Sequence, residues 1–441
     1  MSTFGDLTAP KVEQAGPSGG TEFVYVDISS IDNQSKRIVE PKRLAPDVAP
    51  SRARQRLKKG DVLVSMTRPN LNAVAIVPPD LDGAIGSTGF HVLRANDDVE
   101  PHWLYYAVQS SRFVKAMCEV VQGALYPAVR PKDIREYTIN VPPLGKQREI
   151  VAELEKQFSR LDEAVTNLHR VKANLKRYKA SVLKAAVEGR LVETEASLAR
   201  REGRTYETGE QLLQRILEAR RARWAGKGKY KESVAPVTDE LPDLPEGWTW
   251  ATMPQLGELN RGKSKHRPRD DRALYGGPYP FIQTGDVRRS DGSITEFTQT
   301  YSELGLAQSR LWPKGTLCIT IAANIAETGI LKLQACFPDS VVGFIPQQGS
   351  PTVEYVECFI RTARDRLDRF ASATAQKNIN LEVLEAVAIP TPPLAEQTRI
   401  VAEVDRHLSI IREVDAEVDA NLKRAQALRQ ATLAKAFGDH R

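Results

Sequence analysis

An eight-residue stretch, GELNRGKS at Gly257–Ser264, has the residue types and spacing of a phosphate-binding loop. It fits the pattern G-x-x-x-x-G-K-[ST], in which backbone N–H groups cradle nucleotide phosphates and the lysine neutralises their charge. Such a loop follows a buried strand and opens a helix. Here Pro254 interrupts the segment before the motif, and Pro268, Gly276 and Gly277 after it oppose a long helix. A P-loop NTPase is therefore an alternative that the surrounding sequence disfavours.

The proline pairs suggest a second chemistry, methyl transfer to adenine in DNA. An adenine methylase carries an Asn/Asp-Pro-Pro-aromatic loop, whose ring stacks on the flipped base. Here the pairs Pro78-Pro79, Pro142-Pro143 and Pro392-Pro393 follow Val or Thr and precede Asp or Leu. The stacking ring is missing, so the sequence predicts that this chain is not itself an adenine methylase. The six histidines and four cysteines form no ligand motif either, so we assign no catalytic residue and no metal site.

The composition is that of a mildly basic globular protein. The 441 residues include 62 Lys and Arg against 56 Asp and Glu, a formal net charge of +6. This balance permits a polyanionic partner such as DNA without requiring one. No apolar run reaches the roughly 18 residues of a membrane span, and the first residues lack the basic and apolar regions of a secretory signal. The scattered cysteines are interpreted as reduced thiols, so we expect a cytoplasmic protein with no membrane partner.

The feature that organises the chain is an internal repeat. VPPLGKQREIVAEL at Val141–Leu154 recurs as TPPLAEQTRIVAEV at Thr391–Val404, and a looser match precedes each copy. RLKKGDVLVSM at Arg56–Met66 matches RLWPKGTLCITI at Arg310–Ile321. Each copy therefore consists of one globular unit followed by one long helix.

The phosphate-loop motif has no equivalent in the first copy. GDL at Gly5–Leu7 is matched with GEL at Gly257–Leu259, but the first stretch continues as TAPKVEQ without GKS. A phosphate loop that supports an activity of both copies is not expected in one copy alone. Gly262 is then interpreted as a turn residue that allows a close backbone approach.

The elements that must position these motifs can be read from the hydrophobic pattern. Short β-branched runs bounded by Gly, Pro, Asn and Asp predict strands, and one helical stretch accompanies them, so each unit is predicted to be an α+β domain. After each proline pair, apolar residues step by three and four, which predicts a long helix with a coiled-coil seam. The seam residues are Val151, Leu154, Phe158, Leu161, Val165, Leu168, Val171, Leu175, Tyr178 and Val182 in the first copy, and Val401, Val404, Leu408, Ile411, Val414, Val418, Leu422, Leu433 and Phe437 in the second. Two separate amphipathic helices, each packed on its own domain, are the alternative; pairing is favoured because neither run contains a proline and each can bury the other's apolar stripe.

Together these features resemble the specificity subunit of type I restriction–modification systems. The resemblance rests on the paired PPLxxQxxIVAE helices, on LPEGWTW at Leu244–Trp250 and on GEQLLQRILEARRARW at Gly209–Trp224. The first unit has no counterpart of LPEGWTW. The resemblance implies an α+β fold with two pseudo-repeated target-recognition domains, each reading one half of a split DNA sequence, separated by a long antiparallel coiled coil that fixes the spacer. It places target-recognition domain 1 at 1–141, conserved helix 1 at 142–192, a basic helix and linker at 193–245, target-recognition domain 2 at 246–391 and conserved helix 2 at 392–441.

The resemblance also implies that this chain is not an enzyme. It would dock two methyltransferase subunits and two motor-nuclease subunits, which would carry adenine-N6 methylation and ATP-dependent DNA cleavage. S-adenosylmethionine, ATP and Mg²⁺ are expected on those partners, with no cofactor in this chain. The two halves have diverged, which predicts an asymmetric double-stranded DNA target, because a symmetric pair of readers would recognise a palindrome.

Three kinds of loop supply candidate DNA contacts, since Lys and Arg bind phosphates while polar side chains read base edges. The basic segment Arg261–Arg272 offers Arg261, Lys263 and Lys265. The loops after the central strands offer Thr67, Arg68, Asn70 and Asn324, and the loops before the PPL motifs offer Tyr126, Arg130, Lys132, Gln376, Lys377 and Asn378. For each single residue, an ordinary turn or a solvated charge is the alternative. For the whole chain, the alternative is a coiled-coil scaffold without sequence-specific DNA contact, which gives no reason for two diverged α+β domains.

Overall fold

The computed structural model describes residues 1–14, 16, 21–121, 127–225, 229–265, 268–322, 324–347, 352–372 and 379–438. Contacts divide the chain into two compact units, a first unit of Met1–Val171 with Glu417–Arg441 and a second unit of Lys172–Ala416. Each unit combines strands and helices, which confirms the predicted α+β class. Within the described ranges, no helix is both long enough and apolar enough to cross a membrane.

The first unit is built from short strands that form two small sheets and two additional strand pairs. Its strands are β1 (Ser2–Thr3), β2 (Phe23–Val26), β3 (Ile31–Asp32), β4 (Arg37–Ile38), β5 (Lys42–Leu44), β6 (Ala53–Arg56), β7 (Val62–Ser65), β8 (Val74–Ile76), β9 (Ile85–Ser87), β10 (Phe90–Leu93) and β11 (Thr138–Ile139). Its helices are α1 (Phe4–Leu7), α2 (Pro101–Ala107), α3 (Ser111–Glu119) and α4 (Pro131–Arg135), with 3-10 turns η1 (Ile28–Ser30), η2 (Pro46–Val48), η3 (Pro69–Leu71) and η4 (Pro79–Leu81). One sheet has the antiparallel order β10-β7-β8, and the other has the order β5-β2-β9-β6 with β2 and β9 parallel.

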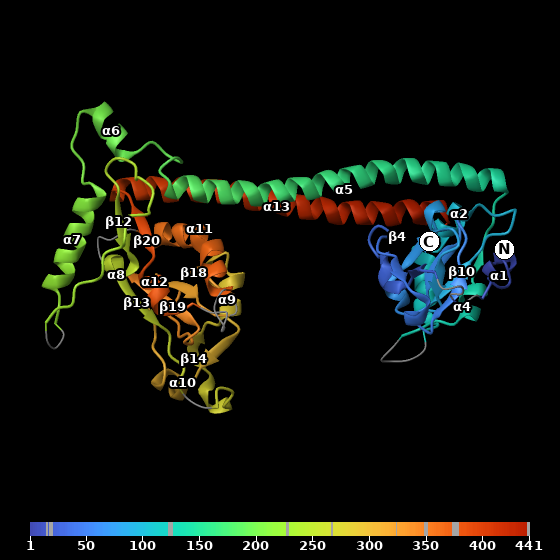
Figure 1. Cartoon of the computed structure of the whole chain (residues 1–441), viewed down its shortest axis with the longest axis horizontal. Helices are drawn as coiled ribbons and strands as arrows, with labels where there is room; N and C mark the ends of the chain where they lie inside the picture. The colour runs from blue at the N-terminus through green and yellow to red at the C-terminus, as the bar shows by residue number, and fades with distance from the viewer. Residues whose placement is uncertain are drawn as a thin grey trace. The chain divides into compact units, whose positions relative to one another are not determined.

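The second unit contains a larger sheet. Its strands are β12 (Thr249–Thr252), β13 (Gly257–Arg261), β14 (Tyr275–Phe281), β15 (Gly292–Ile294), β16 (Gln299–Tyr301), β17 (Leu317–Thr320), β18 (Thr328–Leu331), β19 (Val341–Pro346) and β20 (Ala388–Thr391). Its helices are α6 (Glu195–Glu202), α7 (Gly209–Ala222), α8 (Met253–Leu256), α9 (Thr284–Arg289), α10 (Glu303–Ala307), α11 (Val353–Ser372) and α12 (Leu381–Glu385), with the 3-10 turn η5 (Arg272–Leu274). The sheet order is β13-β19-β17-β18-β15, and α11 packs over β18 on the side of α5 and α13 (Figure 1).

The two units repeat one framework around a buried central strand. Val62 of β7 pairs with Leu93 and Ile76, and Leu317 of β17 pairs with Phe344 and Ile330. Both strands consist of residues that are buried throughout, and most of these are apolar or β-branched residues that favour a strand buried on both faces. The central strands therefore occur in the order that the sequence repeat predicts.

The match of GDL with GEL was wrong by three residues. Thr3 pairs with Thr138 on β11, and Thr252 pairs in the same way with Ala388 on β20, so Thr3 and Thr252 are equivalent. GDL therefore lies in α1, whose equivalent is α8, whereas GEL begins the following strand β13. The same pairing shows how the first unit begins: Ser2–Thr3 occupies the edge that β12 occupies in the second unit.

The two long helices, α5 (Leu144–Val187) and α13 (Leu394–Ala436), pair antiparallel within each unit. In the first unit Arg429 bonds Asp162 at 2.7 Å, and in the second Tyr178 bonds His407 at 2.9 Å. Within the second unit Lys172 also pairs with Asp415 at 3.8 Å, so residue numbers fall along α13 as they rise along α5. Most seam residues are buried or half-buried, but Val171, Tyr178 and Val414 are exposed, because two helices cannot enclose every position of a wide apolar stripe.

The segment before the second unit packs onto that unit. Leu212 and Ile216 of α7 are buried in its main core, and Gly209 lies so close to the Thr391 carbonyl that an added Cβ would stand 2.3 Å from its oxygen. Glycine is therefore required at the start of α7.

Candidate DNA interface

The GELNRGKS stretch does not form a phosphate loop. Its first five residues form strand β13, and Lys263 donates its backbone N–H to the Phe337 carbonyl at 3.1 Å instead of presenting it to a ligand. Within the residues described around it, Ser264 is followed by no helix before the 3-10 turn η5. Gly262 does serve close packing, because an added Cβ would lie 2.3 Å from the Pro338 carbonyl oxygen.

In the first unit, the turn after the central strand meets the loop that leads to α4. Met66 accepts a backbone bond from Val129 at 2.8 Å, and the Arg68 N–H donates to the Pro127 carbonyl at 2.8 Å. Two of the predicted loop regions, which are 60 residues apart in sequence, therefore form one surface. Thr67, Arg68 and Asn70 are all exposed on it.

Arg68 is held in an unusual backbone conformation. Its φ of 48° lies in the left-handed region, which a residue with a Cβ seldom adopts. Such strain persists only where the surroundings impose it, and it is concentrated at functional sites. The exposed guanidinium is therefore presented by a fixed turn and not by a free loop.

Lys36 supports this turn, and sequence analysis missed it. Its Nζ donates to the Asn72 carbonyl at 2.6 Å, and Tyr105 Oη donates to the Lys36 carbonyl at 2.8 Å. Burial lowers the pKa of Lys36 to about 8, and only the charge of Asp32 opposes this. A lone lysine in a β-hairpin carries no sequence signal for this role, because its partners are backbone carbonyls of a distant turn.

The other first-unit candidates differ in their freedom to reach a ligand. Arg130 is exposed, but its guanidinium bonds the Asp133 carboxylate at 2.8 Å and holds the pKa of that group below its usual value. Lys132 forms a solvated pair with Glu136 at 3.5 Å. Tyr126 lies outside the described residues.

The second unit has the same backbone hydrogen bonds at the end of its central strand. Ile321, the equivalent of Met66, accepts from the Ile379 N–H at 3.1 Å, as Met66 accepts from Val129. Ile321 also donates to Ser340 at 3.0 Å, and Met66 donates to Gly89 at 3.0 Å. Both units therefore fix the end of the central strand by the same two backbone hydrogen bonds, and we call this arrangement the shared frame.

The side chains on this shared frame differ between the units. Asn324 is half-buried, and its Oδ1 accepts from Nη1 of Arg288 at 3.2 Å. Arg288 was not among the sequence candidates, and no local motif marks it, because the contact joins α9 to a turn 36 residues away. Gln376, Lys377 and Asn378 lie outside the described residues.

The basic candidates of β13 lie beside the same frame. Arg261 is exposed and its Nε donates to the Asp339 carbonyl at 3.0 Å, next to Ser340, which bonds Ile321. Lys263 and Lys265 are exposed as well, and the Lys265 N–H donates to the Gln308 side chain. The segment Asp339–Ser340 thus contacts both Arg261 and the end of the central strand.

The paired PPLxxQ motifs have a structural explanation. Gln147 Nε2 donates to the Pro142 carbonyl at 2.9 Å, and its Oε1 accepts from the Glu100 N–H at 2.8 Å. Gln397 repeats both contacts with Pro392 and Thr352, at 2.7 and 3.2 Å. The motif therefore joins each long helix to the first turn of α2 or α11.

The comparisons with known proteins agree with this architecture. A family model described as the type I restriction modification DNA specificity domain matches residues 19–176 and 245–420. The chain belongs to this family of type I restriction–modification specificity subunits, which confirms the resemblance that the sequence motifs predicted.

Individual relatives support the same assignment. The chain is 23% identical over 371 residues to the specificity subunit of the type I restriction enzyme HindI from Haemophilus influenzae, covering 78% of this chain and 79% of that protein. It is 22% identical over 347 residues to the EcoDI specificity subunit from Escherichia coli, covering 77% and 70%. It is also similar to the solved HsdS subunit from Thermoanaerobacter tengcongensis, with 27% identity, a TM-score of 0.54 and coverage of 99% and 95%. A chain from a structure that addresses complex assembly and conformational transition of the type I R-M system gives 27% identity, a TM-score of 0.70 and coverage of 99% and 96%.

Proposed function

We propose that each unit reads one half of a bipartite, asymmetric DNA site and that this chain supplies the sequence specificity of a type I restriction–modification complex. The observation that carries the proposal is the repeated frame. Met66 and Ile321 end the two central strands with the same two backbone bonds, whereas the side chains around them differ. Two readers of different half-sites need this combination, because backbone geometry positions the loops and side chains specify the bases.

The candidate contacts divide between the units. In the first unit, we assign base or phosphate contacts to Thr67, Arg68, Asn70, Tyr126, Arg130 and Lys132. In the second unit, we assign them to Arg261, Lys263, Lys265, Asn324, Gln376, Lys377 and Asn378. The fixed turn at Arg68 makes it the strongest candidate of the first unit, because its side chain is exposed and its backbone is held in the left-handed conformation by the bond from its N–H to the Pro127 carbonyl.

The long helices supply the spacer and the binding sites for other subunits. Helices α5 and α13 have 44 and 43 residues, and their number of turns sets the separation of the half-sites. The docking of two methyltransferase subunits on these helices is part of the same proposal. Those partners and two motor-nuclease subunits would bind S-adenosylmethionine, ATP and Mg²⁺ and would carry out methylation and cleavage.

A segment exchange tests the two-reader proposal. Residues 30–122 are replaced by the corresponding segment of another family member, and the methylated motif is determined by methylome sequencing of the host. We expect one half of the motif to change while the other half and the spacer stay the same. The matched control exchanges residues 284–372 and should change the opposite half; a change in both halves, or in neither, contradicts the proposal.

The scaffold alternative is tested separately. The chain assembled with its methyltransferase subunits is mixed with duplexes that contain or lack the methylated motif, and binding is followed by electrophoretic mobility shift. Sequence-selective binding is expected. Equal binding to both duplexes, or none, would favour a coiled-coil scaffold.

A further inference from the structure

We propose that a basic groove of the second unit binds the phosphate backbone of the DNA that flanks the second half-site. The groove is defined by Lys176, Lys179, Arg288, Arg364 and Arg366. This inference rests on the proposed DNA-reading function and adds a sequence-independent contact surface to it.

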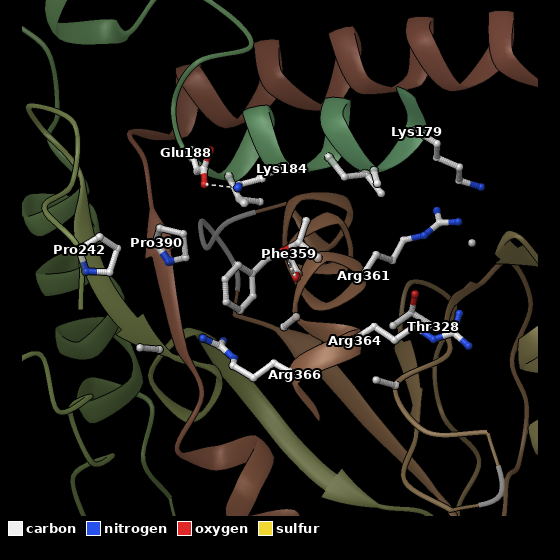
Figure 2. A pocket seen from close by; sticks show the side chains of 18 of the residues that line it. Lys179, Lys184, Glu188, Pro242, Thr328, Phe359, Arg361, Arg364, Arg366 and Pro390 are labelled. Atoms are coloured by element: carbon white, nitrogen blue, oxygen red, sulfur yellow. Dashed lines mark hydrogen bonds and ion pairs between the residues drawn. The ribbon is translucent and has the colours of Figure 1, made fainter. Parts of the chain in front are cut away.

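The groove is a cavity of about 1120 Å³ within the second unit. The C-terminal part of α5 forms one wall, α11 forms another, and the segment Leu241–Pro245 closes one end. Figure 2 shows Lys179 on α5 and Arg361 on α11 extending toward the same side, and the buried Phe359 of α11 also lines the cavity. Leu183 of α5 and Phe359 of α11 are buried in one hydrophobic cluster, so the exposed charged side chains of the lining are the part that a ligand can contact.

The lining carries an excess of positive charge. It contains seven Lys and Arg residues and four Asp and Glu residues. Asp291 bonds Lys179 at 3.0 Å and Arg361 at 2.9 Å; although its burial opposes ionisation, these cations keep the pKa of Asp291 below its usual value. Lys176 and Arg366 are exposed and have no hydrogen-bond or ion-pair partner among the described side chains. An anionic ligand could therefore contact cations that Asp291 holds in place as well as the exposed cations Lys176 and Arg366.

The groove is continuous with the turn assigned to base contacts. Arg288 bonds Asn324 at 3.2 Å, and Glu327 at the end of the same turn bonds Arg364 at 2.8 Å. A duplex whose bases reach Asn324 would bring its sugar–phosphate chain along this surface. Phosphate contacts fix the register and orientation of a protein on the duplex without reading the sequence. Such contacts along the groove would hold the Asn324 turn at the bases that it reads.

The first unit has a smaller cavity at the equivalent place, and the charge of its lining differs. This cavity of about 520 Å³ is lined by two cations, Arg112 and Lys115, and by three carboxylates, Glu119, Asp133 and Glu136, together with Thr138. Thr138 is equivalent to Ala388, which lines the groove of the second unit, and Arg112 follows Glu100 by the same interval as Arg364 follows Thr352. Both α3 and α11 thus contribute an arginine to a cavity lining, and the excess of positive charge is found in the groove of the second unit.

The test measures the salt dependence of DNA binding. The variant Lys176→Ala/Arg366→Ala, assembled with methyltransferase subunits, is titrated with duplexes that carry or lack the recognised motif, from 50 to 200 mM salt. Affinity should fall by the same factor for both duplexes, and the slope of log K against log salt should become shallower by about 1.8. The matched control Arg177→Ala/Arg223→Ala removes the same charge from an exposed position of α5 and from the exposed residue that follows α7, both outside the groove, and should match the wild type.

The outcomes separate this inference from the proposed function. If the wild-type complex binds selectively and the groove variant keeps its affinity and slope, the inference is wrong and the DNA-reading function stands. If the groove variant loses methyltransferase subunits at unchanged DNA affinity, the groove binds an acidic protein segment, which also overturns the inference. If the wild-type complex shows no selective binding, the proposed function itself fails. Both substituted residues are exposed, so thermal melting of the variant should match the wild type.

Discussion

The two units share a backbone frame but differ at the start of their long helices. In the second unit Glu396 is fully buried, where its carboxylate accepts from Trp248 Nε1 at 3.0 Å and from the Glu195 N–H at 2.8 Å. The same position of the first repeat holds Lys146, which is exposed and pairs with Glu149 at 2.8 Å. The difference follows from what covers each helix: residues of the 193–248 segment cover α13, whereas no described residue makes the equivalent contacts on Lys146. The repeated PPLxxQ motif thus keeps the same backbone position in both units, while the residue at this position is exposed or buried according to the segment that packs on it.

The largest effect is expected from a substitution that removes this covering contact. Trp248→Ala removes a nearly buried indole and leaves the Glu396 carboxylate without one of its donors, so the second unit should lose about 3–5 kcal/mol of unfolding free energy. Chemical denaturation with hydrogen exchange would locate the loss in β12, β20 and the start of α13. Lys146→Ala at the exposed counterpart should change stability by less than about 0.5 kcal/mol. Equal effects at the two positions would contradict the distinction.

The second prediction concerns a contact that both units share. Gln147→Ala and Gln397→Ala each leave a backbone N–H and a carbonyl without their buried partner, so each should cost about 1–3 kcal/mol in its own unit. Hydrogen exchange should show loosening of α2 in the first variant and of α11 in the second. A cost confined to one variant would mean that the motif is structural in one repeat only.

The third prediction sharpens the contrast between the turns. Lys36→Met removes the bond to Asn72 but keeps much of the buried stem, so the Arg68 turn should loosen at a cost of about 1 kcal/mol. Methylation assays should show weaker sequence discrimination at the first half-site and unchanged discrimination at the second. Unchanged discrimination at the first half-site would remove Lys36 from the positioning role.

The pH dependence of this variant gives a further readout. The folded pKa of Lys36 is about 8, below its ordinary value of 10.5, because burial disfavours the charged form. The unfolded chain therefore binds more protons between these values, and the contribution of Lys36 to stability increases as pH rises from about 8 to 10.5. The stability difference between wild type and Lys36→Met should grow over that interval, and a flat difference would contradict the lowered pKa.

Much of the architecture could be predicted from local pattern. The PPLxxQ repeat, the apolar steps along Val151–Leu168 and the β-branched runs at Val62 and Leu317 each depend on neighbouring residues, and the structure contains the corresponding helices and strands. The GKS motif was placed correctly outside a nucleotide site because prolines and glycines around it oppose the required helix. The match of GDL with GEL failed because three shared letters carry less information than the pairing of Thr3 and Thr252 with their strands.

The candidate interface was predicted only in part. Exposed turn residues such as Thr67, Arg68 and Asn70 could be named because strand ends and prolines mark turns. Their support could not, since Lys36 and Arg288 act on turns some 36 residues away. The sequence also could not show that Glu396 is buried while Lys146 is exposed, because burial depends on the packing of a distant segment.

The sequence by itself determined the duplication, the α+β class, the long helices and the family, because each is written in residue types at short or repeated spacing. Only the tertiary structure decided which loops share a surface, which charges are buried and where cations gather into a groove. The physical reason is that these properties depend on contacts between residues distant in sequence, such as Trp248 with Glu396 and Glu327 with Arg364.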